Sequence, residues 1–403
     1  MRMKRMAAAV AVAALVPLGL AACSSSGSGT PSGTVKLTVQ DYFTAPKPAI
    51  DPIYQSCAAD GKVSITISHV PGASYITKVL QQSSSRTLPD VLMLDNPDVQ
   101  QFASTGVLAP LEDYGMTGSG EADGVLAAST YKGKLYGLQP VANSLALFYN
   151  TDLFKAANLN PPTTWAELAA DAKALTASGR YGFAFSGINT YEGTWQFMPY
   201  MWTNGGSEKD LNSSENAQAL QFLTDLVKSG SASKSVVGWN QGDVNNQFIA
   251  GKAAMMENGP WNIPALKAAT KLHWASVPIP PRDASQTSQA PLGGEAYTVP
   301  RNSDKAKMAA AAKFVACLNS DKNQKANAVA NMEVPSNKAL ASEFAAANPD
   351  LASIVTIVGN GRARTALLGP DWPAAATKIY TAEQLALTGK ANPADAFTQA
   401  ASQ

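Results

Sequence analysis

Alternating apolar and polar positions mark the start of an α/β pattern in this chain. Strands are predicted for residues 35–39, 63–68 and 90–95, which alternate or form short apolar runs rich in β-branched side chains. Helices are predicted over residues 75–84 and 99–105, and Gly106 provides a stop signal. Strands that alternate with helices predict parallel βαβ units and an α/β fold. Ligand sites of such sheets lie beyond the carboxyl ends of the strands.

The later part of the chain has a more helical pattern. Two more strands are predicted over residues 135–140 and 145–149, and two amphipathic helices over residues 215–228 and 304–318. Thr164 is predicted to cap another helix, with Glu167 three residues later, as in a capping box.

Six of the seven tryptophans, all of which lie in the later two thirds of the chain, are Trp195, Trp202, Trp239, Trp261, Trp274 and Trp372. Several stand beside Gly, Pro or Asn, which predicts loops rather than regular helices. Loops on a rigid scaffold are where ligands are usually bound. Tryptophans also build hydrophobic cores, so their placement alone is a modest signal.

Composition indicates a globular protein of about two domains. The 403 residues are 45% hydrophobic and 15% charged, which excludes a disordered chain. The formal net charge is +1, with Lys and Arg spread evenly, so no basic stripe indicates a nucleic-acid partner.

The first 22 residues are predicted to be a signal peptide. A cationic head ends at Arg5, an apolar run reaches Leu20, and small residues precede Cys23. This ending resembles the lipobox of bacterial lipoproteins, which implies that Cys23 is lipidated and holds the mature chain on the outer face of the membrane. An ordinary secretory signal with an incidental cysteine is the alternative. Residues 23–33, rich in Gly and Ser, are expected to form a flexible tether.

The two other cysteines, Cys57 and Cys317, would reside in an oxidising compartment, where thiols tend to pair. A disulfide and two buried free thiols both remain open at this point. The histidines, His69 and His273, stand alone, without a second ligand at zinc spacing. We therefore expect neither a metal site nor a cofactor.

Catalytic motifs are missing from the sequence. It contains no G-x-S-x-G, no phosphate-binding loop, no G-x-G-x-x-G after a strand and no H-E-x-x-H. Paired carboxylates are harder to exclude, because a glycosidase needs only two acids about 5 to 10 Å apart. Acids beside Gly, Pro, Asn or aromatic residues are Asp41, Asp95, Glu192, Glu257, Glu295 and Asp371. Together with the tryptophans they favour carbohydrate, because flat rings cover the apolar face of a sugar and carboxylates bond its hydroxyls.

Four stretches carry a resemblance to a known family: residues 135–153, 161–168, 248–261 and 292–299, the third ending in Asn258-Gly-Pro-Trp261. In this order they resemble the extracellular solute-binding proteins of sugar-importing ABC transporters, the family that includes the maltose-binding protein. The resemblance implies an α/β, two-lobed periplasmic-binding-protein-like fold, with several hinge crossings and the ligand cleft between the lobes. By similarity, the first lobe comprises residues 34–143 and 294–331, and the second comprises 144–293 and 332–403. Both Cys57 and Cys317 then belong to the first lobe, which favours a disulfide.

The resemblance also implies ligand-binding positions. Asn143 at the first crossing and Trp261 are the principal ones, with Trp261 expected to lie against a sugar ring. The others are Asp41, Tyr42, Phe43, Asp95, Asn96, Glu192, Trp195, Gly294, Glu295, Arg364 and Trp372. Asn143 stands where the maltose-binding protein carries an acid, so a different sugar is expected.

The function implied is that of a monomeric, lipid-anchored subunit of an ABC importer. It would bind a di- or oligosaccharide of the trehalose, maltose or cellobiose type by closure of the cleft. It would then deliver the sugar to the transmembrane subunits of a permease, without catalysis. A surface glycoside hydrolase that uses two cleft carboxylates is the alternative. A receptor of the same fold for a polyamine, phosphate ester or iron chelate is disfavoured by the aromatic residues.

Overall fold

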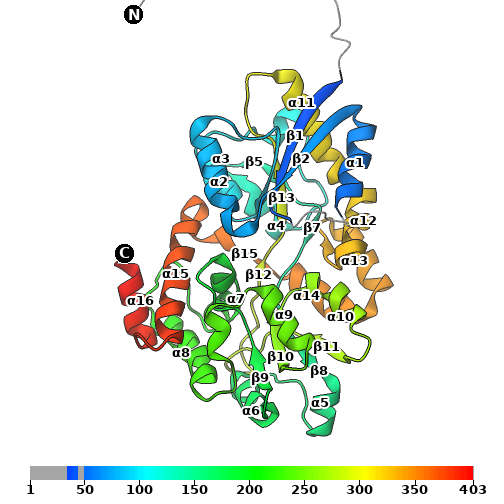
Figure 1. Ribbon diagram of the computed structural model, residues 1–403. Helices are drawn as coiled ribbons and strands as arrows, with labels where there is room; N and C mark the ends of the chain where they lie inside the picture. Colours follow the sequence, from blue (N-terminus) through cyan, green and yellow to red (C-terminus); the bar gives the residue numbers. More distant parts are fainter. Residues whose placement is uncertain (1–33, 44–49, 403) are drawn as a thin grey trace, which may run out of the picture. The chain divides into compact units, whose positions relative to one another are not determined.

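The computed structural model describes residues 34–43 and 50–402, so the predicted signal peptide, the tether and Cys23 lie outside the described residues. The described part of the chain is built on two mixed sheets, each with helices on both faces (Figure 1). Within residues 34–43 and 50–402, no helix is long and apolar enough to cross a membrane.

The strands of the first sheet are β1 (Val35–Asp41), β2 (Val63–His69), β3 (Val91–Asp95), β6 (Gly137–Leu138) and β13 (Glu295–Thr298), in the order β2-β1-β3-β13-β6. Strands β1, β2 and β3 run parallel, as the alternation of strands and helices predicted. Strand β13 returns from far along the chain and pairs antiparallel with β3 and β6. Glu295 thereby lies opposite Asp95.

Helices cover both faces of this sheet. They are α1 (Asp51–Asp60), α2 (Gly72–Ser85), α3 (Asp98–Ser104), α4 (Asp123–Ser129), α11 (Lys305–Leu318) and α12 (Asp321–Asn331). Val91 and Met93 of β3 pack in the cluster with α1 and α11, whereas Leu92 and Leu94 pack in the cluster with α2 and α3. The alternation follows from the period of two in a strand. Figure 1 shows α1 and α11 on the opposite side of β1 from α2 and α3.

A disulfide joins α1 to α11. The sulfur atoms of Cys57 and Cys317 are 2.04 Å apart, and their Cα atoms are 5.7 Å apart. The pairing favoured by the family resemblance is therefore confirmed.

The strands of the second sheet are β8 (Ala146–Asn150), β9 (Tyr181–Ala184), β10 (Ala253–Asn258) and β11 (Trp274–Val277), in the order β11-β8-β10-β9. The helices around it are α5 (Thr151–Ala156), α6 (Trp165–Leu175), α7 (Tyr191–Thr203), α8 (Ser214–Lys228), α9 (Gln241–Ile249), α10 (Ile263–Ala268), α13 (Lys338–Ala347), α14 (Ala352–Gly359), α15 (Trp372–Leu387) and α16 (Pro393–Ala401).

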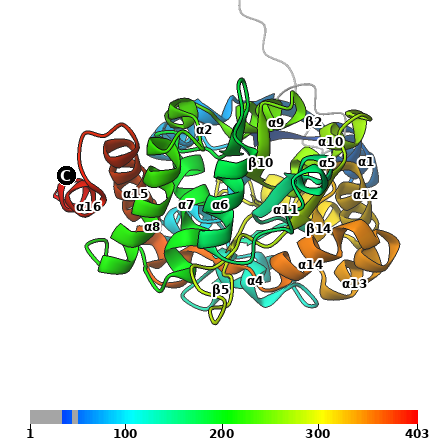
Figure 2. The ribbon, with the colours of Figure 1, turned by 90° about the horizontal axis from the view of Figure 1, so that it is seen from below.

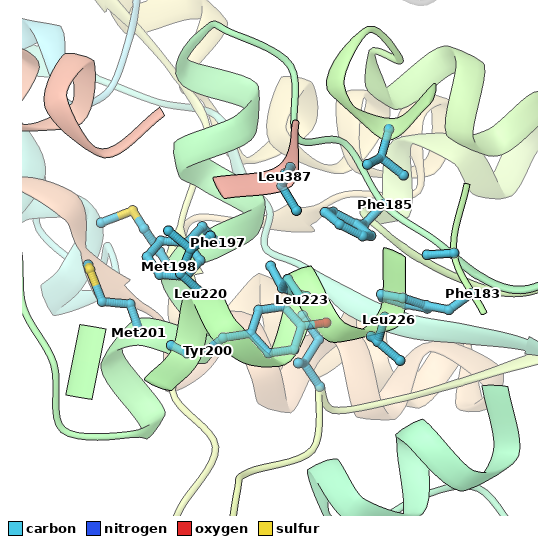
Figure 3. Packing of buried hydrophobic residues seen from close by; sticks show 14 of the residues in the cluster. Phe183, Phe185, Phe197, Met198, Tyr200, Met201, Leu220, Leu223, Leu226 and Leu387 are labelled. Atoms are coloured by element: carbon cyan, nitrogen blue, oxygen red, sulfur yellow. The ribbon is translucent and has the colours of Figure 1, made fainter. Parts of the chain in front are cut away.

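The larger core of the second sheet forms beneath α7, α8 and α15. Phe183 of β9 and Met255 of β10 point into it, whereas Phe148 and Met256 belong to the cluster on the other face, with α9, α10 and α14. Figure 3 shows aromatic and aliphatic side chains from β9, α7, α8 and α15 gathered in this core. The C-terminal helices α15 and α16 lie beside α7 and α8 (Figure 2).

The chain passes between the two sheets at short paired segments. These are β7 (Val141–Ala142) with β14 (Val334–Pro335), and β12 (Pro291–Leu292) with β15 (Arg362–Ala363). The remaining short elements are β4 (Thr130–Tyr131), β5 (Lys134–Leu135), η1 (Leu111–Tyr114), η2 (Lys234–Val237), η3 (Pro260–Asn262), η4 (Pro349–Leu351), η5 (Arg364–Ala366) and η6 (Gly369–Asp371). Ser144 Oγ donates to the carbonyl of Pro291 at 2.7 Å, which ties two crossings together.

Three local predictions are corrected by the structure. Residues 135–140 do not form one strand but contribute to β5 and β6, which are two residues each and belong to different sheets. Thr164 Oγ1 accepts from the N–H of Glu167, as predicted, but Glu167 Oε2 reaches back to the N–H of Thr163 at 2.7 Å, one residue earlier than a capping box requires.

The third correction concerns the tryptophans. Trp195 and Trp202 lie inside α7, Trp372 begins α15 and Trp274 begins β11. Of these four, Trp372 stands directly beside a proline, Pro373, and the loop interpretation was wrong for it, because a neighbouring proline is a weak signal that tertiary packing overrides.

Candidate ligand-binding site

Arg364 is the centre of a buried polar cluster where the C-terminal segment meets the first sheet. Its side chain is 3% exposed, and Nη1 donates to Asp95 Oδ2 at 2.9 Å. Nη2 donates to Asp95 Oδ1 and, at 3.0 Å, to Asn96 Oδ1. Asp95 ends β3 and Asn96 follows it, so the bidentate pair forms at the carboxyl end of a parallel strand.

Two tryptophans predicted to bind ligand contact this guanidinium group instead. The Arg364 Cζ atom lies 4.5 Å from the ring centroid of Trp195 and 5.3 Å from that of Trp372. Trp195 is 6% exposed and Trp372 is 0% exposed. Both rings therefore contribute cation–π contacts to Arg364, with little surface left open.

Tyr42, Phe43 and Glu295 form the adjoining part of the cluster. Tyr42 Oη donates to Glu295 Oε1 at 2.8 Å, and the rings of Tyr42 and Phe43 meet edge to face with centroids 5.6 Å apart. Burial raises the pKa of Tyr42 well above its usual value, and the charges of Glu295 and Asp95 raise it further. The phenol thus stays neutral and keeps its proton to donate.

Asn143 and two glycines form the crossing beside this cluster. The backbones of Asn143 and Gly293 exchange hydrogen bonds of 3.1 and 2.9 Å, and Asn143 Nδ2 donates to Glu333 Oε1 at 3.0 Å. A Cβ atom on Gly293 would come within 2.6 Å of the Trp195 ring. Gly294 has φ +138°, and its carbonyl accepts from the N–H of Asn96 at 3.1 Å. Only residues without a side chain fit this close approach.

Trp261 lies apart from Arg364, after the carboxyl end of β10. It belongs to η3, is partly exposed, and packs against the cluster that contains Trp195 and Trp372. Its ring covers Gly259, where an added Cβ would lie 1.9 Å from the indole. The Gly-Pro-Trp sequence thus holds the six-membered ring of the indole against the backbone of Gly259 and leaves part of the side chain exposed.

Two predicted ligand residues have internal partners instead. Asp41 is 0% exposed, lies 2.7 Å from His69 Nδ1 and accepts from Tyr54 Oη at 3.1 Å. Glu192 Oε2 accepts from the N–H of Gln241 at 2.9 Å, which links the starts of α7 and α9. Burial raises the pKa of both carboxyls. A ligand role for Asp41 and Glu192 stays a prediction.

The acid Glu257, considered above beside the tryptophans, lies in the core under α7. Glu257 of β10 and Glu383 of α15 are both 0% exposed. Burial raises the pKa of each well above its usual value, and the neighbouring Glu383 raises that of Glu257 further. Both acids are thus held neutral inside the second sheet's core rather than lining a surface.

Sequence reasoning missed Asp98 and Tyr191, which adjoin the Arg364 cluster. Asp98 is the first residue of α3, is 5% exposed, and has a pKa raised to about 8 by burial and by the charge of Asp95, partly offset by Arg364. The ring of Tyr191 meets that of Trp372 at 5.5 Å. An acid in the first turn of a helix is an ordinary start signal, so nothing local distinguished Asp98.

The architecture defines a class of protein. Two α/β lobes joined by several crossings, with carboxylates, an arginine and aromatic rings gathered around the carboxyl end of β3, are the arrangement of two-lobed solute receptors. A model of the family described as bacterial extracellular solute-binding protein matches residues 53–353. The chain belongs to this family.

Similar proteins span nearly the whole chain. The galactooligosaccharide-binding protein of Bacillus subtilis strain 168 is 25% identical over 100% of this chain and 97% of its own. The maltooligosaccharide ABC transporter solute-binding lipoprotein of Streptococcus pneumoniae serotype 4 is 26% identical over 87% of this chain and 84% of its own. The GacH receptor of Streptomyces glaucescens, solved unliganded and with acarbose, has a TM-score of 0.79 and 26% identity over 92% of this chain and 97% of that one. The family and two-lobed fold implied by the motifs are confirmed.

Proposed function

We propose that this protein is the substrate-binding subunit of an ABC importer and binds a di- or oligosaccharide reversibly. The observation that carries the proposal is the cluster of Asp95, Glu295, Arg364 and Tyr42 at the ends of β3 and β13, together with the partly exposed Trp261 after β10. Such residues bond the hydroxyl rim and cover the apolar face of a sugar. Support also comes from the similar proteins, whose names specify galactooligosaccharide and maltooligosaccharide.

The two lobes comprise residues 34–143 with 294–331, and 144–293 with 332–403. Sheet membership supports this division, because β13 joins the first sheet while β8 to β11 form the second. Closure would bring Trp261, from the second lobe, towards the first-lobe residues Asp95 and Glu295. A sugar that contacts both lobes favours the closed state by its differential affinity, so closure needs no covalent chemistry.

Calorimetric titration tests the binding. Maltotriose, galactotriose, trehalose, cellobiose and xylobiose are titrated separately into the mature chain, and at least one is expected to saturate a single site. A reducing-end assay on the same mixtures is expected to detect no product. Absence of heat with every sugar would refute the proposal, and sustained release of reducing ends would favour the glycoside hydrolase instead.

The lipid anchor at Cys23 completes the proposal and has its own test. Cys23→Ser is expected to release an intact sugar-binding protein into the medium, because the acceptor for the lipid is lost while the binding domain is untouched. Membrane and medium fractions are compared by immunoblot, with Ser25→Ala as a control that stays with the membrane. A Cys23→Ser chain that remains on the membrane after signal cleavage would show that the lipobox interpretation is wrong, while sugar binding would stand.

The permease transmembrane subunits are the partners of the lipid-held, monomeric receptor. A tether raises the concentration of the receptor at the permease, which is the physical advantage of anchoring.

A further inference from the structure

Asp98 is a buried acid, and one of its carboxyl oxygens has no hydrogen-bond partner within the described protein. It begins α3, three residues after Asp95, and is 5% exposed. Its Oδ1 atom is wholly buried and has no hydrogen-bond partner among the described residues. A buried carboxyl oxygen without a partner is costly, so an unpaired one beside a binding site calls for a ligand.

The nearby cation, Arg364, compensates Asp98 only in part. Both Nη atoms of Arg364 bond to Asp95 and Asn96, and the Asp95 carboxylate takes two of those bonds. Of the charged groups that perturb the carboxyl, Asp95 on β3 raises the pKa and Arg364 on η5 lowers it, after the larger effect of burial. The balance leaves the pKa at about 8, so the acid keeps its proton at neutral pH.

The other elements packed against α3 or close to Asp98 supply no further cation. Burial raises the pKa of Tyr191 on α7 and of Tyr75 on α2, and an ionised Asp98 would raise both pKa values further. Both phenols therefore stay neutral. Of the elements that pack on α3, η6 carries Asp371, α4 carries Asp123 and β4 carries Tyr131. Asp123 is exposed and bonds to Lys338.

A neutral carboxyl group can donate a hydrogen bond, whereas a carboxylate only accepts. Asp95 accepts from Arg364 and Glu295 accepts from Tyr42, so both act as acceptors in the cluster. We propose that Asp98 is a specificity-determining residue of this site, whose protonated carboxyl donates a hydrogen bond to an oxygen of an uncharged sugar. This inference rests on the proposed sugar-binding function. An anionic ligand is disfavoured by Asp95, and a cationic one would bind better to the ionised acid.

Asp98→Asn tests the inference, because asparagine has nearly the same shape and is a neutral donor at every pH. The sugar of the calorimetric panel that saturates the wild-type protein is titrated at pH 6.5 and pH 9. The wild-type dissociation constant is expected to rise about tenfold between these pH values, as the neutral fraction falls about tenfold for a pKa of about 8. The Asp98→Asn protein is expected to bind at both pH values as the wild type does at pH 6.5. Asp123→Asn, a change of an exposed acid on α4, should keep the wild-type pH profile.

A ligand-free measurement checks the ionisation and the folding of the variant. The carboxyl loses its proton near pH 4 in the unfolded chain but only at about pH 8 in the folded one. Its stabilising contribution is therefore present below about pH 4 and is lost as the pH rises to about 8. The melting temperature of Asp98→Asn relative to wild type should rise between pH 5 and pH 8.

The outcomes separate the two proposals. If no sugar binds the wild-type protein, the proposed function fails and the inference fails with it. If the wild type binds but Asp98→Asn loses affinity at pH 6.5, or shows the same tenfold change with pH, the inference alone is overturned.

Discussion

Replacing Arg364 with alanine is expected to lower the free energy of unfolding by about 3 kcal/mol, the lower part of the range for breaking a buried ion pair. Asp95 would lose the guanidinium that donates to both of its oxygens, and Trp195 and Trp372 would lose the cation between them. The side chain of Asp95 is 26% exposed, so water can partly replace the lost bonds. Urea denaturation followed by fluorescence measures the change.

Arg362→Ala is the matched control. Arg362 lies two residues earlier, and its guanidinium carbon is 4.5 Å from the ring centroid of Trp202. It is partly exposed, so its removal is expected to cost about 1 kcal/mol or less. Equal losses in the two variants would show that the ion pair with Asp95 is not the source of the stability. A double-mutant cycle of Arg364→Ala with Asp95→Ala then isolates the pair from the packing.

Replacing Trp261 with alanine is expected to weaken sugar binding by about tenfold to a hundredfold, or 1.4 to 2.7 kcal/mol. The prediction rests on the proposed function. Trp261 is partly exposed and its six-membered ring lies against Gly259, so the side chain is held in place while part of it remains accessible. A preorganised ring covers the apolar face of a sugar without a further cost in side-chain entropy. Calorimetry with the saturating sugar measures the loss, and Trp261→Phe should lose less.

Two further variants separate stacking from general damage to the second sheet. Trp274→Ala removes an indole at the opposite end of this sheet, because Trp274 pairs with Asn150 while Asn258 pairs with Ala146. It should leave the affinity unchanged. Gly259→Ala keeps the indole but adds a Cβ that would overlap it, so the ring must move and affinity should fall. Unchanged affinity in both Trp261→Ala and Gly259→Ala would exclude Trp261 from the binding surface.

Part of the candidate site could be predicted because its residues sit in recognisable local contexts. Asp95 and Asn96 follow an apolar strand, and Glu295 follows two glycines at a crossing. The structure brings Asp95 and Glu295 opposite each other and joins Asp95 and Asn96 to Arg364. The sequence could not show that Arg364 covers Trp195 and Trp372. Arg364 lies 169 residues after Trp195 and 8 residues before Trp372, and no local sequence pattern predicts contacts at such separations.

The buried acids illustrate the same limit. Asp41, with His69 and Tyr54 as partners, looks in sequence like any acid that ends a strand. Glu257 precedes the Asn-Gly-Pro-Trp motif and seemed suited to a cleft, yet it lies fully buried under α7. Asp98 resembled a common helix start. Each of these residues acquires its environment from elements that other parts of the chain supply.

The sequence by itself determined the strands and helices that begin the fold and the family to which the chain belongs, because periodicity and ordered motifs are properties of short segments. The tertiary structure alone decided which polar groups are paired and which acids stay neutral. Arg364 meets Asp95 across 269 residues, and Asp98 keeps its proton at neutral pH because burial and the charge of Asp95 outweigh the effect of Arg364 on its pKa. Desolvation and charge pairing depend on distances in space, and folding sets these distances.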